Sequence, residues 1–493
     1  MSNNLKSTVI VLVCLLFSAA NDASADDLRD EYDAFLRQAR QEYEGFRTQI
    51  NREYADFLSA PWEAVKPTII KPPIEPPVPP KPLPDDGERE DRKINYDNVV
   101  PPVLPTPHPQ PQPVEPVIVA PMPTDKWVTF KYLGNTDKVR HGQRQIFNWY
   151  GANESQVAQT WKEMSDSRLD ATLNDCLTLR SKYKLCDWAY LEMLNEIAKT
   201  VYPTDRARAT MLTAWLYCQS GYRIRMARNR SGHPVMLFAC DNIIFGPYFN
   251  LDGRKYYPYG EEDMSLYISG ASFPKEQTMS LVLSQLPLAA EDMTVERERK
   301  SRIYPEMNCS VSLNKNLIDF FGRYPNAKTT DNMMTRWANY ANTPLSTQAK
   351  NALYPHFRKV LGGMSDLDAV SRLLNWVQTG FVYEYDDKVW GQDRAFFPDE
   401  TLYYPYADCE DRAILFSRLV RDLVGLDVLL VYYPGHLATA VRFNEQVPGD
   451  YIVLKGQRYT VCDPTFTTGA PVGRTGTGYD NASATVILLP ANR

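Results

Sequence analysis

Hydrophobic and polar positions divide the chain into a helical start, a proline-rich stretch and a long globular remainder. At the start, the segment EYDAF at 31–35 recurs as EYEGF at 42–46 and as EYADF at 53–57, with a spacing of 11 residues. Eleven residues over three helical turns keep Tyr and Phe on one nearly straight stripe, which predicts an amphipathic helix over 28–58, ended by Pro61. Such a helix either forms a homo-oligomer as a coiled coil, docks a partner, or folds back on its own globular body. The pattern favours none of these.

The second part of the chain, 61–125, is rich in proline. The pairs Pro72-Pro73, Pro76-Pro77 and Pro79-Pro80 occur there among few large apolar residues. A segment of this kind buries too little apolar surface to fold alone, so we predict an extended, semi-rigid linker. The alternative is that it serves as a ligand for proline-binding modules.

Helical and strand patterns alternate in the globular remainder. Helices come first and strands follow in each half, which predicts the α+β class, with helices packed on antiparallel sheets. We expect an upstream domain over 126–265, a connecting β-rich region over 266–345 and a C-terminal domain over 346–493. Helical patterns occur at Trp188–Lys199, Arg206–Gln219, Ala349–Leu361, Leu367–Gln378 and Asp411–Val424, and strand patterns at Pro234–Ala239, Met279–Leu286, Val428–Tyr433, Ala438–Phe443, Tyr451–Leu454 and Arg458–Val461.

The first residues, 1–25, have the features of a secretory signal peptide. Lys6 precedes an apolar run from Val9 to Phe17, and Ala23-Ser24-Ala25 matches a cleavage site. This run is far shorter than the ~20 residues that span a bilayer. We therefore predict export, periplasmic or secreted, with no transmembrane segment after signal cleavage. Helix 26–60 would then open the mature chain.

The composition and the short motifs of the chain argue against several classes of function. The formal net charge of −6 comes without a basic stripe, so we expect no nucleic-acid partner. The five histidines are scattered, and neither a CxxC nor an HExxH motif occurs, nor a P-loop or dinucleotide fingerprint, so we predict no metal and no cofactor. Seven cysteines remain after the signal, and an odd number in an oxidising compartment indicates a free, reactive thiol.

One cysteine has the local context of a nucleophile. Cys409 is expected at the first residue of a helix that Asp408 caps, where exposed N–H groups and the helix dipole lower a thiol pKa, although acidic neighbours oppose this effect. His436 lies at the start of an apolar strand and Asp463 at the end of another, each 27 residues after the preceding member of the set. A nucleophile, a base and an orienting carboxylate are thus predicted to meet.

These motifs resemble those of the transglutaminase-like superfamily of exported bacterial proteins. The resemblance rests on DCEDRA at 408–413, on Gly435-His436 and on CDPT at 462–465, and it covers roughly Ser365 to Phe466. It implies a papain-like α+β core with Cys409, His436 and Asp463 as catalytic triad. It also makes Trp390 and Gln392 candidates for an oxyanion hole, beside the N–H of Cys409.

The resemblance implies covalent acyl transfer through a thioester. We expect an exported cysteine-nucleophile hydrolase, a peptidase or amidase, that acts on a peptide or protein substrate. A protein-crosslinking transglutaminase on the same triad is the first alternative, and a non-catalytic, peptide-binding adaptor is the second.

The upstream region, Asp205 to Gly260, has a pattern similar to that of the C-terminal one. We predict that 126–265 is a degenerate transglutaminase-like domain, used for binding or scaffolding; chance similarity of helix and strand patterns is the alternative. At an offset of 204 residues, or 203 after one residue's slip, the matched positions are Asp205 with Cys409, Gly221 with Gly425, His233 with His436 and Gly260 with Asp463.

Overall fold

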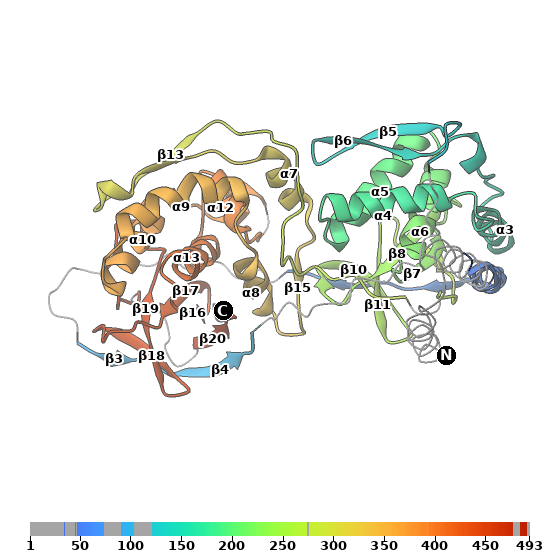
Figure 1. Ribbon diagram of the computed structural model, residues 1–493. Helices are drawn as coiled ribbons and strands as arrows, with labels where there is room; N and C mark the ends of the chain where they lie inside the picture. Colours follow the sequence, from blue (N-terminus) through green and yellow to red (C-terminus); the bar gives the residue numbers. More distant parts are fainter. Residues whose placement is uncertain are drawn as a thin grey trace, which may run out of the picture.

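The computed structural model describes residues 47–72, 90–102, 121–273, 276–391, 393–476 and 484–490, together with Ala34 and Gly45. Within them the chain forms two bodies of mixed helix and sheet that lie side by side (Figure 1). Each body contains a curled seven-stranded sheet with helices packed on it, so the predicted α+β class is confirmed at this level. The expected signal peptide, 1–25, lies outside the described residues.

The upstream body packs helix α6 on strands β7 and β8, and helix α5 on α6. The predicted helices at 188–199 and 206–219 and the strand at 234–239 are confirmed within two residues. The strand order is β1-β12-β7-β8-β11-β10-β2. The elements are β1 (Glu63–Val65), β2 (Thr68–Ile70), α3 (Glu154–Met164), α4 (Asp170–Lys182), α5 (Asp187–Val201), α6 (Arg206–Gln219), β7 (Ile224–Arg228), β8 (Pro234–Ala239), β9 (Ile243–Ile244), β10 (Gly246–Leu251), β11 (Arg254–Pro258) and β12 (Leu266–Ile268).

The C-terminal body has the same plan, with helix α13 against strands β16 and β17 and helix α10 against α13. Its predicted helices and strands are present, with ends shifted by one or two residues. The strand order is β3-β18-β19-β17-β16-β20-β4. The elements are β3 (Arg92–Lys93), β4 (Tyr96–Val100), α9 (Thr347–Leu361), α10 (Asp366–Thr379), α11 (Asp386–Val389), α12 (Pro398–Tyr403), α13 (Cys409–Leu423), β16 (Val428–Tyr433), β17 (His436–Val441), β18 (Asp450–Leu454), β19 (Gln457–Cys462) and β20 (Ala484–Leu488).

The two sheets share strand order and register. Five neighbouring strands, β12-β7-β8-β11-β10, correspond in order to β20-β16-β17-β19-β18. Ile224 lies opposite Phe238 where Val428 lies opposite Val441, which gives offsets of 204 (428 − 224) and 203 (441 − 238). The next two ladders keep the offset of 203. Tyr257 pairs with Phe238 in the upstream body, and Thr460 pairs with Val441 in the C-terminal body. In the same way, Phe249 pairs with Tyr256, and Ile452 pairs with Tyr459. The offsets found in the sequence are thus those of the strand ladders.

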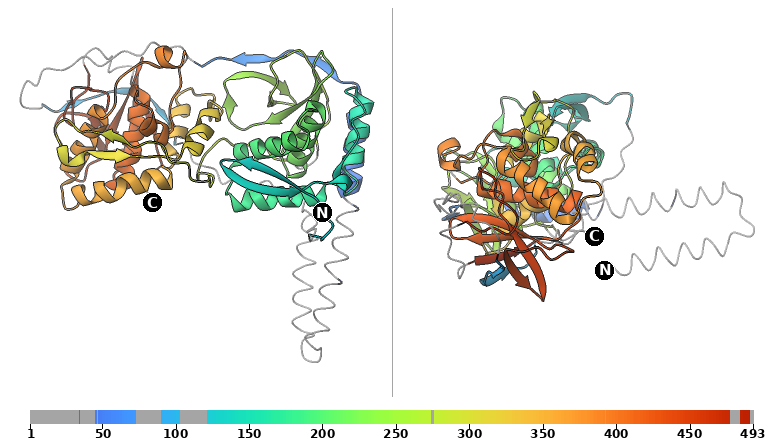
Figure 2. Two further views of the ribbon diagram at one scale, coloured as in Figure 1. Left: turned by 90° about the horizontal axis from the view of Figure 1, so that it is seen from above. Right: turned by 90° about the vertical axis from the view of Figure 1, so that its left-hand side faces the viewer.

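The proline-rich segment supplies edge strands to both sheets. β1 and β2 pair antiparallel with β12 and β10, whereas β3 and β4 pair parallel with β18 and β20 (Figures 1 and 2). Arg92 of β3 also holds Asp450 of β18 through two hydrogen bonds, of 2.7 and 2.6 Å. The predicted spacer, 61–125, therefore does more than separate domains: its described parts cover sheet edges whose N–H and C=O groups would otherwise be open to pairing with another chain.

The N-terminal helix is described over 47–58 and packs on the upstream body. Asn51 is buried and hydrogen bonded to Gln219 of α6 at 3.1 Å, and Tyr54 is buried on the same side. Phe57 is 64% exposed, so only the tyrosine of this repeat faces the upstream body. For its described part, the helix folds back on its own globular body.

The connecting region, 266–345, differs from its prediction as β-rich. Its strands are only two or three residues long, and the predicted strand at 279–286 is wrong. After a single bridge between Met279 and Cys240, its backbone joins no ladder: Ser280 N donates to Asp187 Oδ2 at 2.9 Å and Leu281 N to Asn242 Oδ1 at 2.7 Å. The region's elements after β12 are β13 (Arg297–Arg299), β14 (Cys309–Val311), α7 (Lys315–Arg323), β15 (Ala327–Lys328) and α8 (Thr335–Asn342).

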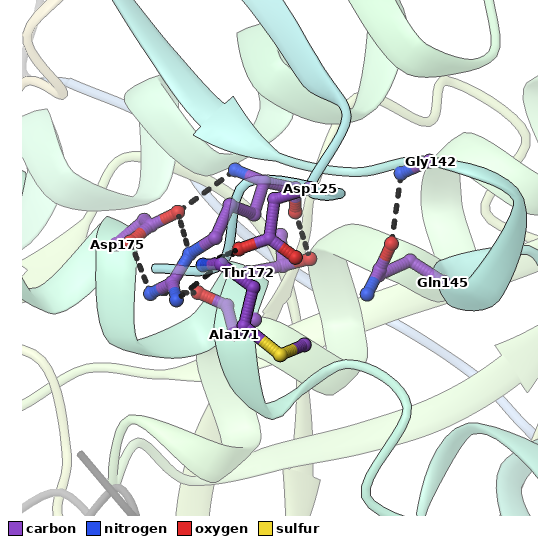
Figure 3. Close-up of polar contacts among 8 residues, drawn as sticks. Asp125, Gly142, Gln145, Ala171, Thr172 and Asp175 are labelled. Carbon is purple, nitrogen blue, oxygen red and sulfur yellow. Dashed lines mark hydrogen bonds and ion pairs between the residues drawn. The ribbon is translucent and has the colours of Figure 1, made fainter. Parts of the chain in front are cut away.

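The hairpin of β5 (Trp127–Tyr132) and β6 (Asn135–Arg140) is held on α4 by a buried guanidinium. Arg140 donates from Nε and Nη2 to the carboxylate of Asp175, at 2.9 and 2.6 Å, and its carbonyl accepts a hydrogen bond from Thr172 at 2.6 Å (Figure 3). These charge-assisted bonds fix the hairpin beside its apolar contacts, in which Phe130 and Val139 are buried in the core.

Candidate active site

Cys409 is the first residue of α13, as its sequence context predicted. The turn before it is held by two buried side chains of the same helix. Asp411 accepts hydrogen bonds from the N–H groups of Phe396 and Asp408, at 2.8 and 3.3 Å. Arg412 donates to three backbone carbonyls, those of Ala407, Gln378 and Phe381, at 3.0, 2.9 and 2.9 Å. The position of the thiol is therefore set by the DCEDR segment itself.

His436 and Asp463 come from adjacent strands. His436 opens β17 after a turn in which Gly435 has a φ of +76°, a left-handed conformation that favours glycine. Asp463 follows the last residue of β19, which pairs with β17. His436 Nε2 lies 2.9 Å from Asp463 Oδ2. Asp463 is itself held, because Thr465 N donates to its Oδ1 at 3.0 Å and Gln378 Nε2 donates to its carbonyl at 2.8 Å.

The thiol lies beside this pair. The N–H of Leu437, the residue after His436, donates to the Cys409 sulfur. Cys409, His436 and Asp463 are 3%, 2% and 1% exposed, and the ring of Tyr433 stacks on the imidazole with a centroid distance of 6.4 Å. The structure thus pairs His436 with Asp463 and places the Cys409 thiol against the residue that follows His436, in a site that is closed to solvent.

The electrostatics of the thiol differ from the expected effect of the helix N-terminus. Burial raises the pKa of Cys409 well above its ordinary value, and the neighbouring carboxyl groups of Glu410 and Asp408 raise it further, while the Leu437 N–H lowers it. Glu410 Oε2 lies 3.2 Å from the sulfur. Desolvation and like charge therefore outweigh the helix dipole, and the thiol is neutral in this closed state.

A group of buried carboxyl groups next to the thiol was not anticipated from the sequence. Oxygens of Asp386, Asp393 and Glu410 lie within 4.8 Å of one another. Burial and the charge of Glu410 raise the pKa of Asp386 to about 8 and that of Asp393 to about 7. Carboxylate oxygens are the ligands that Ca²⁺ and Mg²⁺ prefer, so these residues could hold such a cation, while Asp408, Cys409 and Glu410 form a second group of possible metal ligands in the described chain. In the sequence, the acidic residues at 386–393, upstream of DCED, were the feature that could have indicated this group of carboxyl groups.

The two oxyanion candidates have different outcomes. Trp390 packs against Tyr404 and Phe396, with centroid distances of 4.8 and 5.7 Å, and Arg394 lies over its ring at 4.6 Å. These contacts describe a packing residue, and its oxyanion role stays a prediction. Gln392 lies outside the described residues. Gln378, which sequence reasoning used only as part of a helix, is instead the buried amide that reaches Asp463.

The seven cysteines of the described chain carry no disulfide bond. Those at 176, 218, 240 and 462 are buried like Cys409, so the odd cysteine count does not by itself single out the nucleophile.

In the upstream body the three corresponding positions lack this chemistry. Asp205 caps α6, where it accepts a hydrogen bond from Arg208 N at 2.9 Å. His233 precedes β8 and is exposed, and Gly260 follows β11. Nucleophile, buried base and orienting carboxylate are therefore missing from these three positions.

No helix among the residues that the structure describes has the length and apolar character needed to cross a membrane. Comparisons of the chain with protein-family models, with curated proteins and with solved structures found no match in any of the three.

Proposed function

We propose that the protein is an exported, transglutaminase-like cysteine hydrolase of peptide or amide bonds. The observation that carries this proposal is the arrangement at the N-terminus of α13, where the buried His436–Asp463 pair lies beside the Cys409 thiol. A carboxylate that orients a histidine next to a thiol is the arrangement that cysteine nucleophiles require.

In the proposed reaction His436 takes the proton of the Cys409 thiol as the sulfur attacks the amide carbonyl. Because Nε2 faces Asp463, Nδ1 is the ring nitrogen that handles this proton. The tetrahedral intermediate collapses to a thioester when the C–N bond breaks and His436 gives the proton to the leaving amine. Water then attacks the thioester, His436 takes a proton from it, and the acid and the thiol are released.

The neutral thiol of the closed state makes the base indispensable. Burial and two acidic neighbours raise the pKa of Cys409, so proton transfer to His436 has to accompany the attack. The N–H of Cys409 at the start of α13 is the donor proposed for the oxyanion.

For the upstream body we propose a degenerate copy of the same domain, with a binding role. The shared strand order and the constant offsets of 204 and 203 in the ladders support a common origin. The loss of all three reactive positions supports a role other than catalysis.

Site-specific alkylation tests the enzyme proposal. Iodoacetamide is added to the full chain, and labelling of each cysteine is followed by peptide mass spectrometry. Because the buried Cys409 thiol needs a base to ionise, we expect its labelling to slow in His436→Ala and to stay unchanged in His356→Ala on helix α9, while labelling of the partly exposed Cys309 is the same in all three proteins. Labelling of Cys409 that is indifferent to His436 would overturn the nucleophile.

The fate of the acyl group needs a second assay. A peptide library is incubated with the protein in the presence and absence of a fluorescent primary amine, and products are identified by mass. New peptide termini that depend on Cys409 support hydrolysis. Incorporation of the amine with release of ammonia and without new termini would replace it by transamidation.

A further inference from the structure

The two edges of the C-terminal sheet meet at one seam, and a short part of the proline-rich segment fills it. β3 pairs with β18 at one end of the strand order, and β4 pairs with β20 at the other. Lys93 ends β3 and Tyr96 begins β4, and three residue steps span at most about 11 Å. The segment 90–100 therefore runs along the lower side of the C-terminal body, from one edge strand to the other (Figure 1). A part of the chain that precedes the whole upstream body thus belongs to the body that carries Cys409.

Arg92 connects this segment to a buried carboxylate. Its Nε and Nη2 atoms donate to Asp450 Oδ1 and Oδ2 at 2.7 and 2.6 Å, a bidentate pair that fixes geometry as well as charge. Asp450 Oδ2 also accepts a hydrogen bond from Thr475 N at 2.9 Å. The backbones beside this carboxylate approach closely, because a Cβ atom at Gly449 would lie 2.5 Å from the carbonyl oxygen of Gly473. Arg92 and Thr475 are thus held in one arrangement around Asp450.

Thr475 reaches the proposed base through Tyr433. Burial and the charge of Asp463 raise the pKa of Tyr433, and the side chain of Thr475, beside the Tyr433 hydroxyl group, lowers it. Tyr433 lies opposite His436 in the ladder of β16 and β17. Its buried ring stacks on the imidazole, with a centroid distance of 6.4 Å and an angle of 18° between the planes. A continuous set of contacts therefore joins Arg92 to the imidazole of His436.

We propose that Arg92 is a positioning residue for the imidazole of His436. It acts through the Asp450 carboxylate and the Tyr433 ring, and it has no contact with the reacting atoms. A misplacement of about 1 Å far from the chemistry can cost on the order of a hundredfold in rate, so such a path bears directly on catalysis. The inference rests on the proposed function, because the orientation of the imidazole matters to the reaction only if His436 is the base that serves Cys409.

The proposal changes the extent of the catalytic unit. Arg92 precedes Cys409 by 317 residues (409 − 92), and the whole upstream body lies between them in the sequence. The active site of the C-terminal body is then incomplete without a strand from the proline-rich segment.

Histidine NMR on the full chain tests the proposal without requiring turnover. The protein is labelled with an isotope at histidine Cε1, and the signal of His436 among the five histidines is the one that His436→Ala removes. Arg92→Met should shift this signal, because loss of both hydrogen bonds to Asp450 loosens the Tyr433 ring that stacks on the imidazole. Arg92→Lys keeps the charge without the planar fork of donors, so its shift should be smaller.

Tyr96→Phe is the matched control. It removes one hydrogen bond between the same segment and β18, from the Tyr96 hydroxyl group to the carbonyl oxygen of Val453 at 3.1 Å. The pair of Arg92 with Asp450 stays in place, so the His436 signal should not move.

A double variant tests the path itself. Tyr433→Phe keeps the stacked ring and removes the hydroxyl group beside Thr475. In that background Arg92→Met should add no further shift to the His436 signal, because residues that act through one shared contact are not additive. A shift of the same size in both backgrounds would show that Arg92 does not act through Tyr433 and would overturn the proposed path.

The rate of Cys409 alkylation is the functional readout. Arg92→Met should slow it about fivefold, the effect of one hydrogen bond, toward the rate of His436→Ala, whereas Tyr96→Phe should not. A His436 signal that is unchanged in Arg92→Met, or that moves equally in Tyr96→Phe, would overturn the inference. Alkylation of Cys409 that is indifferent to His436 would instead overturn the proposed function, while the His436 signal would still report the effect of Arg92. The two failures are therefore distinguishable.

Discussion

Replacing Glu410 by glutamine should lower the pKa of the Cys409 thiol. The carboxylate oxygen lies 3.2 Å from the sulfur, and both side chains are buried. At that distance two unit charges repel by about 5 kcal/mol at an effective dielectric constant of ~20, and by about 1.3 kcal/mol in water. Removal of that repulsion stabilises the thiolate relative to the thiol, so Glu410→Gln should lower the thiol pKa. Burial and Asp408 remain, so the pKa should not fall to that of an activated thiolate.

The pKa is measured from the rate of alkylation of Cys409 as a function of pH, read on its own peptide because other cysteines react as well. Glu384→Gln is the matched control, since this carboxylate is ion-paired with Lys388 near the surface at 2.9 Å. The midpoint should move to lower pH in Glu410→Gln and stay in place in Glu384→Gln. An unchanged midpoint in Glu410→Gln would show that the thiolate does not form next to this carboxylate, and would refute the electrostatic reasoning.

Three further outcomes are expected. Arg412→Met leaves three buried carbonyls without their donor, so it should lower the free energy of unfolding, measured in urea, by about 3 kcal/mol or more. Arg358→Met, on the surface of α9, is the control and should change this free energy by under about 0.5 kcal/mol. Because burial raises the pKa of Asp386 to about 8, the folded state holds a proton that the unfolded chain releases at lower pH. The melting temperature should therefore fall as the pH rises through 7 and 8, and Asp386→Asn should flatten that fall; a melting temperature that rises over this window would contradict the shift. Deletion of residues 1–102 removes β1 to β4 and should cause aggregation in size-exclusion chromatography with light scattering, whereas a chain that starts at residue 47 should elute as the same species as the full chain.

Local periodicity accounts for most of the elements that the sequence predicts. α6 and β8 match their predicted ranges, and α13 and β19 differ by one or two residues, because burial of one face leaves its period in the sequence. The stretch 279–286 shows the limit of this signal. It alternates like a strand, yet after one bridge at Met279 its next two N–H groups donate to side chains of Asp187 and Asn242 instead of to a neighbouring strand.

Long-range pairing is what the sequence could not reveal. The short strands β1 to β4 carry little hydrophobic pattern, and their place follows only from the edges that they cover. The same holds at the site. Cys409, His436 and Asp463 each have a local motif, whereas the contact of Gln378 with Asp463 and the gathering of Asp386 with Glu410 depend on the fold.

The contrast between the two bodies has a physical basis in the histidine and its carboxylate. A His–Asp hydrogen bond is strongest where solvent is excluded, so the body that keeps His436 and Asp463 has to pack protein around them. In the other body Gly260 has no side chain and His233 is exposed, so nothing requires the same place to be closed. A cleft of about 990 Å³, lined by Trp188 and Tyr259 among others, lies in this body. On this reasoning, a body without the triad has no need of a closed site there, and the binding role proposed for the upstream body requires no change of fold.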